Sequence, residues 1–430
     1  MRVALLNPPW SFAGSIYFGC REPHLPLELG YCRSLLEAAG HEVLMLDGAF
    51  DGLTIAGLAE RVAQFAPDMA VLTTAPTYLF WRCAQPELTI PAALAAAVRP
   101  YVPCLAAIGP HGSSTPRAVL SKLPVDLVVM GEAEEIVADL ANGADWATTP
   151  GIASWDGDAP SVAGGPHAGR FVDLPALRWP DSWIQAHHHH HHRFERPPEG
   201  PGAEVEASRG CPYSCSFCAK LHFRDRYRRR QLDIVLDEID ALIAQGAKYL
   251  YFVDEIFLPQ RALLEALIDR PVRFGVQTRI DLWKPELLEL LGEAGCVSIE
   301  AGVESVTEKG RATLDKNCRM STEQLAERLI FAKRHVPFVQ ANLLEVASDD
   351  QVLLDAWRDR LRSQGVWAND PVPLFPYPGS PDYLARFGPP DDWAWERAHR
   401  SYLSAFDAFS DIQEERPLPL GELERSCRCA

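Results

Sequence analysis

Three cysteines packed into eight residues constrain this chain more than any other feature. They form Cys-x3-Cys-x2-Cys at Cys211, Cys215 and Cys218, and no fourth cysteine lies nearby. The other eight of the eleven cysteines are scattered, which is not the pattern of a disulfide scaffold in a chain of 430 residues. Three thiolates on a 4Fe-4S cluster leave one iron with an open position. An open iron can chelate the amino and carboxylate groups of an amino-acid ligand.

The alternative interpretation of these cysteines is a zinc site, or three thiols that are simply buried. Zinc usually takes a fourth Cys or His ligand at similar spacing. His222 is the only candidate close to the three cysteines.

The second half of the chain alternates apolar runs with helical patterns. Strands are predicted at residues 203–207, 249–253, 274–277, 297–301, 338–343 and 372–376, with helices at 232–245, 285–293 and 322–334 between them. Six β/α units predict a six-stranded partial TIM-like barrel over residues 203–388. The cysteine segment follows the first of these strands, at the end where such folds place their active sites.

The first half shows the same alternation. Strands are predicted at residues 3–6, 42–46, 69–74, 104–108 and 127–130, with helices at 27–39, 55–65 and 115–122. This α/β pattern predicts a Rossmann-like, doubly wound parallel sheet over residues 1–145. Residues 146–202, rich in Pro, Gly, Trp and Asp and containing the run His187–His192, are predicted as a linker. We assign the histidine run no role, and we expect residues 389–430 to be a helical extension.

The cysteine spacing, with the aromatic Phe217 before the last cysteine, resembles the signature of the radical S-adenosylmethionine (SAM) superfamily. The resemblance implies that the cluster passes one electron to bound SAM. Cleavage then gives methionine and a deoxyadenosyl radical, which abstracts hydrogen from a substrate.

Polar residues at the ends of later strands resemble SAM contacts of this family. Asp254 and Glu255 are similar to a paired-acid variant that accepts hydrogen bonds from the SAM ammonium. Arg279 is expected to pair with the SAM carboxylate. Residues 302–305 resemble the Gly-x-Glu-Ser segment of the family, and residues 375–381 resemble its loop that packs on adenine. Residues 340–345, on the predicted fifth strand, depart from the glycine-rich pattern that the family commonly has there. The predicted SAM-binding residues are Phe217, Asp254, Glu255, Gln277, Arg279, Glu304 and Ser305.

Loops at the carboxyl ends of the first five strands are where a parallel sheet binds ligands. Their order, with a Pro-His turn at residues 109–116 and a Gly-Glu-x-Glu turn at 131–134, resembles the cobalamin-binding domain of cobalamin-dependent radical SAM enzymes. The resemblance covers most of residues 1–145. The predicted cobalamin-binding residues are Asn7, Pro8, Thr73, Thr74, Thr77, Gly109, Pro110, His111, Ser113, Gly131 and Glu132.

Two absent motifs refine this prediction. No Asp-x-His-x-x-Gly occurs, so the resemblance implies a lower cobalamin face without a His ligand, and residues 73–78 would face the cobalt. No Gly-x-Gly-x-x-Gly follows the first strand, which disfavours a dinucleotide. The alternative is a flavodoxin-like domain that has lost its ligand and only supports the barrel.

Charge and hydropathy exclude other classes of function. A net charge of -17 argues against nucleic-acid binding. The N-terminus lacks a signal-peptide pattern, and no run reaches the roughly 18 apolar residues that span a bilayer, so we expect a cytoplasmic protein that does not enter membranes. Five arginines between residues 224 and 230 predict either a docking patch for an acidic electron donor such as flavodoxin, or a solvated helix start.

Together these patterns predict a cobalamin-dependent radical SAM methyltransferase that acts on a small-molecule or natural-product substrate. A second prediction keeps both cofactors but replaces methylation with rearrangement or cyclisation. A third is a non-catalytic iron-sulfur protein, which would cleave no SAM.

Overall fold

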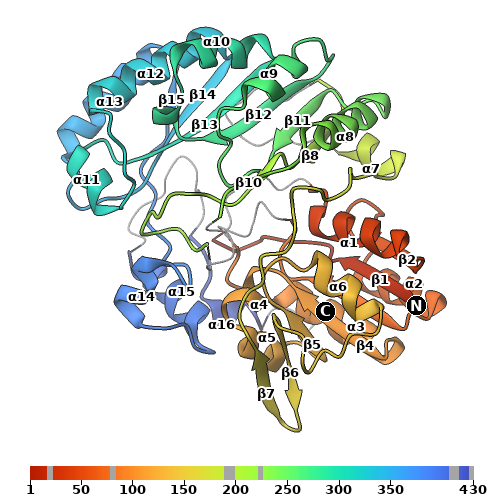
Figure 1. Ribbon diagram of the computed structural model, residues 1–430. Helices are drawn as coiled ribbons and strands as arrows, with labels where there is room; N and C mark the ends of the chain where they lie inside the picture. The colour runs from red at the N-terminus through yellow and green to blue at the C-terminus, as the bar shows by residue number, and fades with distance from the viewer. Residues whose placement is uncertain (17–22, 78–83, 188–198, 221–225, 406–415, 426–430) are drawn as a thin grey trace.

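The computed structural model describes residues 1–16, 23–77, 84–187, 199–220, 226–405 and 416–425. Figure 1 shows two α/β units that face each other, with the C-terminal helices lying beside the N-terminal unit. The predicted fold class is confirmed, because each unit is built on a parallel sheet flanked by helices.

The N-terminal sheet has seven strands in the order β2-β1-β3-β4-β5-β6-β7. Its parallel part consists of β1 (Arg2–Asn7), β2 (Glu42–Asp47), β3 (Met69–Thr73), β4 (Cys104–Ile108) and β5 (Leu127–Val129). Its helices are α1 (Leu27–Ala38), α2 (Ile55–Phe65), α3 (Thr89–Val98), α4 (Pro110–Ser114), α5 (Pro116–Lys122) and α6 (Glu134–Ala141). Two separate apolar cores lie on the two faces of this sheet, as double winding requires. The strand order reverses between β1 and β3, which is where open α/β sheets bind ligands.

The segment predicted as a linker contains regular structure. The antiparallel hairpin of β6 (Ile152–Asp156) and β7 (Ala159–Ala163) extends the N-terminal sheet from the edge of β5. Further along, α7 (Asp181–Ala186) places the Trp183 indole nitrogen 2.7 Å from the Asp51 carboxylate, while the Leu177 amide donates to Glu238 at 2.8 Å. This half of the segment therefore packs on both units, as expected of a connection that drapes over them.

His187, the first residue of the histidine run, is fully buried. Its Nε2 lies 2.8 Å from one carboxylate oxygen of Glu204, and the other oxygen lies 2.7 Å from His24 Nδ1. His187 therefore helps to join the linker to the first strand of the second unit; residues 188–192 lie outside the described residues.

The second unit is a six-stranded sheet of parallel strands in the order β15-β14-β13-β12-β11-β8. Its strands are β8 (Gly202–Val205), β11 (Tyr249–Phe252), β12 (Arg273–Thr278), β13 (Cys296–Glu304), β14 (Phe338–Leu343) and β15 (Trp367–Ala368). Its helices α8 (Leu232–Ala244), α9 (Arg261–Leu267), α10 (Pro285–Glu293), α11 (Glu308–Thr313), α12 (Thr322–His335) and α13 (Gln351–Ser363) follow these strands, mostly on the side away from the N-terminal unit (Figure 1).

The sixth strand was misplaced by the sequence pattern. Residues 372–376 were predicted as this strand, but it is β15, and Val372 makes only an isolated bridge to Leu344. Prolines at positions 371, 373 and 376 remove backbone donors that a strand ladder needs, so this segment runs along the barrel mouth as a loop.

The cysteine loop leaves and re-enters the fold through a short antiparallel ladder. In this ladder β9 (Ser208–Arg209) pairs with β10 (Arg228–Arg229), with Arg209 opposite Arg228. The loop between them is thus closed at its base, and Figure 1 shows β10 between the two units.

The C-terminal helices α14 (Pro381–Phe387), α15 (Ala394–Ala405) and α16 (Leu420–Leu423) pack on the N-terminal unit. Lys122 pairs with Glu424 at 2.7 Å, and the Thr89 hydroxyl donates to the Leu423 carbonyl at 3.0 Å. The Trp395 indole donates to Thr115 at 3.1 Å. In the described part of the extension predicted at residues 389–430, α15 and α16 are helical, and the end of α16 and the residue after it contact α3 and α5 of the N-terminal unit.

Candidate active site

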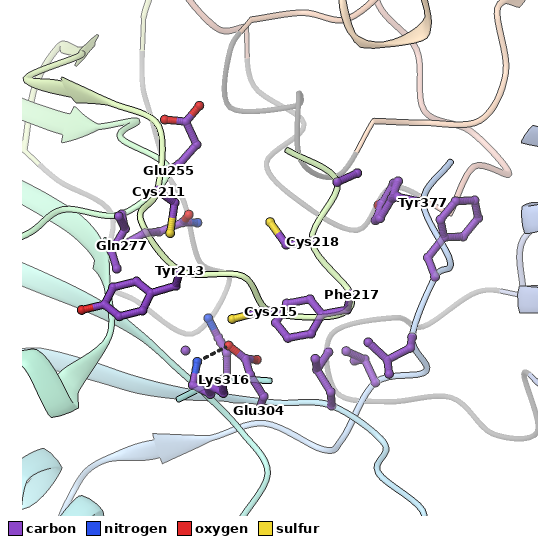
Figure 2. Close-up of a pocket in the computed structure, with 18 of the residues that line it drawn as sticks. Cys211, Tyr213, Cys215, Phe217, Cys218, Glu255, Gln277, Glu304, Lys316 and Tyr377 are labelled. Carbon is purple, nitrogen blue, oxygen red and sulfur yellow. Dashed lines mark hydrogen bonds and ion pairs between the residues drawn. The ribbon is translucent and has the colours of Figure 1, made fainter. Parts of the chain in front are cut away.

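The three cysteines line one cavity of about 360 Å³ at the mouth of the second sheet. All three are half-buried and outside any disulfide, and Figure 2 shows them along one loop. Burial raises the pKa of the Cys211 and Cys215 thiols, and Lys220 and Lys316 respectively oppose that rise. Among the described residues, no group of three or more His, Cys, Asp and Glu side chains is arranged to hold a single metal ion. His222, the candidate fourth ligand of the zinc alternative, lies outside the described residues.

Backbone and side-chain contacts hold the cysteine loop in place. The Ser216 amide donates to the Leu314 carbonyl at 3.0 Å, and the Asp382 amide donates to the Ser216 carbonyl at 2.9 Å. Lys220 returns to the start of the loop and donates to the Cys211 carbonyl at 2.9 Å. The loop is thus fixed by α14, by the end of α11 and by its own lysine.

Five of the predicted SAM-binding residues line the cavity: Phe217, Glu255, Gln277, Arg279 and Glu304. Glu255 accepts a hydrogen bond from the Gly210 amide at 2.7 Å, which ties the end of β11 to the cysteine loop. Arg279 pairs with Asp281 at 2.7 Å and lies 4.1 Å over the Tyr213 ring. Its second terminal nitrogen has no hydrogen-bond partner among the described residues and remains available to an anionic ligand.

The other two predicted SAM-binding residues are not among the described residues that line the cavity. Asp254 is fully buried, accepts from the Ala207 amide at 2.9 Å and from the Ser208 hydroxyl, and is not among the described residues that line the cavity. Ser305 is also buried and donates to Asp349 at 2.6 Å. Asp254 therefore anchors the end of β8, and Ser305 anchors the turn after β13.

Sequence reasoning missed three charged residues of the cavity, Lys220, Lys316 and Glu300. Lys316 is almost fully buried and lies 3.0 Å from Glu304, the ion pair drawn beside Cys215 in Figure 2. Its neighbours Asp315 and Asn317 both have positive φ, so Lys316 lies in a tight turn. The Asp-Lys-Asn sequence was the available turn signal. Glu300 accepts from Tyr251 at 2.8 Å and from Gln277 at 3.1 Å, and nothing in the sequence distinguished it from other strand residues.

The opposite side of the cavity is apolar and aromatic. Phe375 and Tyr377 come from the proline-rich loop, Tyr402 from α15, and Ile16 from the N-terminal unit. Phe375 contacts both Tyr377 and Tyr402, with ring centroids 4.6 and 5.5 Å apart. The cavity therefore has a charged side at the strand ends and an aromatic side built from three distant segments.

At the first sheet, Asn7 and Thr73 meet where the strand order reverses. The Thr73 hydroxyl donates to the Asn7 side-chain oxygen at 2.8 Å, and the Asn7 amide donates to Asp47 at 2.6 Å. Burial raises the pKa of Asp47 to about 7. Pro8 is buried next to Asn7. Thr77 accepts a hydrogen bond from the Leu27 amide at 3.4 Å, and residues 78–80 of the same predicted loop lie outside the described residues.

The Pro-His turn forms the next part of this edge. Gly109 has φ +130°, and a Cβ on it would meet the Thr74 hydroxyl oxygen at 2.2 Å, so only glycine allows this approach. His111, on α4 after the buried Pro110, is fully buried; its Nε2 lies 2.7 Å from the Gln85 carbonyl, and burial lowers its pKa to about 4. Among the described residues the side-chain oxygens Thr74 Oγ1 and Gln85 Oε1 are buried without a hydrogen-bond partner. Unpaired buried polar atoms at a ligand-binding edge point to a missing polar ligand.

The Gly-Glu-x-Glu turn contacts both the Pro-His turn and the second unit. Ser113 accepts a hydrogen bond from the Gly131 amide at 2.8 Å, and a Cβ on Gly131 would meet the backbone of His167 at 2.3 Å. Glu132 is fully buried and pairs with Arg228. Its carboxylate therefore binds the second unit, where the sequence predicted a cobalamin contact.

The same pairing divides the arginine segment. Arg228 and Arg230 are drawn inward by Glu132 and Glu238, and only Arg226 and Arg229 of the described arginines here are exposed. Arg224 lies outside the described residues. Arg228 and Arg229 form strand β10 and not a helix start, and the docking of an electron donor stays a prediction.

Comparison with known proteins supports the assignment of the second unit. Residues 205–352 match the model of the radical SAM superfamily. The chain is 25% identical over 321 residues to an uncharacterized methyltransferase of Pyrococcus horikoshii, covering 71% of this chain and 66% of that protein. It is 26% identical over 353 residues to the anaerobic magnesium-protoporphyrin IX monomethyl ester cyclase of Cereibacter sphaeroides, covering 77% and 55%. The chain thus spans less than two thirds of the length of each relative.

The fold also matches a solved structure. The radical SAM methyltransferase TsrM of Kitasatospora setae, with cobalamin and a 4Fe-4S cluster bound, superposes with a TM-score of 0.70 at 18% identity over 89% of this chain and 73% of that one. The same enzyme has been solved with its tryptophan substrate and a SAM analogue.

Residues 205–352 form a radical SAM domain, and the chain shares, over most of its length, the fold of a radical SAM methyltransferase solved with cobalamin bound. Among the described residues, none of the helices has the length and apolar character that a membrane crossing needs.

Proposed function

We propose that this protein is a cobalamin-dependent radical SAM methyltransferase. The observation that carries the proposal is the convergence of three cysteines and five predicted ligand residues on one cavity that is also lined by Ile16 of the N-terminal unit. Relatives named as methyltransferases support it. Residues 1–145, extended by the β6–β7 hairpin, would bind cobalamin, and residues 203–388 would form the radical SAM core.

The cavity fits a cluster with SAM on its open iron. Cys211, Cys215 and Cys218 supply three thiolates, which matches a 4Fe-4S cluster with one iron left for a ligand. When bound, the cluster supplies the electron for SAM cleavage, and cobalamin supplies the methyl group. Arg279 would pair with the SAM carboxylate through its free nitrogen, and Glu255 and Glu304 would accept hydrogen bonds from its cationic and polar groups.

The edge of the first sheet fits a large ligand that carries amides. Thr74 and Gln85 offer unpaired buried oxygens, and Gly109 permits close backbone approach. We assign Asn7, Pro8, Thr73, Thr74, Thr77, Gly109, Pro110, His111, Ser113 and Gly131 to this site, with Gln85 added to the predicted set. His111 would support the turn as a neutral ring, because its pKa of about 4 keeps it unprotonated at neutral pH.

The aromatic side of the cavity would hold the substrate. Phe375, Tyr377 and Tyr402 offer planar apolar surface opposite the charged strand ends, so a small organic molecule would lie between the two cofactor sites. By closing that side, these rings would also exclude water from a radical intermediate.

The proposal includes a low-potential electron donor, such as a flavodoxin, because the cluster must be reduced before SAM is cleaved. It also places the protein in the cytoplasm, where thiols such as the seven free cysteines of the described chain stay reduced.

The test is anaerobic reconstitution of the cluster followed by addition of hydroxocobalamin, desalting, and absorbance and iron measurements. We expect about four irons per chain, as one 4Fe-4S cluster requires, and roughly one cobalamin. Reductive cleavage of SAM by this loaded protein is the accompanying assay. Iron without retained cobalamin would refute the methyltransferase and leave a radical SAM enzyme on a supporting first domain. Absence of SAM cleavage would leave only the non-catalytic iron-sulfur protein.

Cyclisation is the second candidate, favoured by the similarity to the magnesium-protoporphyrin monomethyl ester cyclase over 77% of this chain. The mass of the product separates the two reactions, because methylation adds one methylene equivalent and ring closure adds none.

A further inference from the structure

We propose that Glu132 and Glu134 of the first sheet, with Arg209 and Arg228 of the cysteine-loop ladder, form a charge clamp that positions the cluster loop against the N-terminal unit. The clamp joins two segments that lie 75 to 96 residues apart in the chain. Only the purpose of the clamp, which is to hold the two cofactor sites in a fixed relative position, rests on the proposed function.

Arg209 is the centre of the clamp and lies two residues before the first cluster cysteine. Its guanidinium is fully buried and makes two hydrogen bonds to Glu206, at 2.9 and 2.8 Å. Its remaining terminal nitrogen donates to Glu134 at 2.7 Å and lies 3.6 Å from Glu132. The planar fork of arginine is suited to joining two carboxylates in this way, whereas a lysine is not.

The faces of the Arg209 guanidinium are also covered. The group lies 4.4 Å from the Phe171 ring, which comes from the linker, and 5.6 Å from the Tyr31 ring of α1. Three parts of the molecule therefore surround this side chain, and water is excluded from it.

Arg228 makes the second connection, on the other strand of the same ladder. It pairs with Glu132, with one nitrogen at 2.9 Å from a carboxylate oxygen, and it also donates to the Gly169 carbonyl at 2.7 Å. Because Arg209 and Arg228 are directly opposite each other in the β9–β10 ladder, both sides of the loop base are held by one turn of the first sheet. A rotation of the loop about a single contact is thereby prevented.

The charges explain why this contact is specific. The fully buried Arg209 and the mostly buried Arg228 meet three buried carboxylates, those of Glu132, Glu134 and Glu206. Removal of an arginine leaves buried carboxylates without their counter-charge, and removal of the Glu134 charge takes the ionic acceptor from one Arg209 nitrogen. Breaking such a pair is far more costly than losing an exposed one. Sliding of one unit against the other is therefore disfavoured.

The experiment compares Glu134→Gln with Glu135→Gln by hydrogen exchange in the full chain, with the cluster reconstituted. Glu135 is the matched control, because it lies next to Glu134 but accepts from the Arg170 amide and does not contact the ladder. In Glu134→Gln we expect amides of residues 206–230 to exchange about tenfold faster or more, while those of β12 and β13 keep their protection. Arg209→Lys keeps the charge but loses the fork, and we expect the same selective acceleration.

Equal exchange in Glu134→Gln and Glu135→Gln would overturn the proposal, and so would acceleration spread evenly over the whole second unit. A second readout is the distance distribution between paramagnetic Co(II) cobalamin and the reduced cluster by pulsed electron paramagnetic resonance, which should broaden in Glu134→Gln only. If the wild-type chain retains no cobalamin, the proposed function fails while the exchange comparison still tests the clamp.

Discussion

The mouth of the second sheet and the edge of the first sheet both lie at the carboxyl ends of parallel strands, but they bind in different ways. At the second sheet, half-buried thiols and charged side chains surround an open cavity. At the first sheet, polar groups bond mostly to one another, as in Asn7 with Thr73, and helix α15 covers the turn through Trp395. The first arrangement suits metal ligation by thiolates and ion pairing with a ligand. The second suits binding by shape complementarity and by close approach of a ligand to the backbone.

The two regions also differ in how they are assembled. The cluster ligands come from one loop of eight residues. The edge of the first sheet combines residues from β1, β3, the Gln85 segment, α4 and the C-terminal helices. Substitutions should therefore separate the two regions cleanly, and the following predictions run from the largest expected effect to the smallest.

Loss of a single cluster thiol should abolish cluster binding at the second sheet and leave cobalamin binding at the first sheet unchanged. We expect Cys215→Ala to lose the cluster and all reductive SAM cleavage, because two thiolates do not hold a 4Fe-4S cluster that needs three. Cobalamin retention should stay at the wild-type level. Iron content, absorbance and deoxyadenosine release measure this, with Cys318→Ala as the control thiol outside the loop. Iron retained in Cys215→Ala would contradict the assignment.

A methyl group at Gly109 should weaken cobalamin binding at the first sheet and leave the iron content of the second unit unchanged. The new Cβ would collide with the Thr74 oxygen at 2.2 Å, so we expect Gly109→Ala to weaken cobalamin retention by about tenfold or more while iron content is unchanged. Gly143→Ala is the matched control, because Gly143 also has positive φ but would meet nothing within 4 Å. Equal cobalamin affinity in the two variants would mean that the Pro-His turn does not bind cobalamin.

Stability of the first unit should depend on pH through Glu87. Burial raises the pKa of Glu87 to about 7 from 4.5, so the folded state holds its proton more tightly than the unfolded state. This contribution to stability is full below about pH 4.5 and is lost as pH rises towards 7. We expect Glu87→Gln to become more stable relative to wild type by about 1–2 kcal/mol between pH 5.5 and 7, measured by denaturant unfolding. For the control variant Glu60→Gln, at an exposed position, we expect a stability difference from wild type that does not change with pH. A pH-independent stability difference between Glu87→Gln and wild type would contradict the prediction.

The two charges of the ion pair beside Cys215 should shift the midpoint potential of the cluster in opposite directions. Lys316 and Glu304 lie 3.0 Å apart in the cavity, and reduction adds negative charge to the cluster. We expect Lys316→Met to lower the midpoint potential by roughly tens of millivolts and Glu304→Gln to raise it, because the local charge changes in opposite directions. Potentiometric titration followed by electron paramagnetic resonance measures both. Shifts of the same sign would show that the variants act through the loop structure.

Much of the fold followed from the sequence. Five of the six predicted strands of the second unit, and all five of the parallel strands of the first, fall where apolar runs predicted them. The errors have physical causes. The strand predicted at residues 372–376 is interrupted by prolines, and the β6–β7 hairpin was missed because Pro, Gly and Asp in that segment favour turns.

The sequence by itself predicted the three cysteines proposed as cluster ligands, because a thiolate loop is a local pattern that needs no distant partner. It also determined the α/β class, because hydrophobic periodicity is written along the chain. Only the tertiary structure decided which acids face the cavity. Asp254 and Glu255 are adjacent in sequence, but one anchors β8 and the other lines the cavity. It also decided that Glu132 pairs with Arg228, since the partner of a buried charge is fixed by packing across 96 residues of chain.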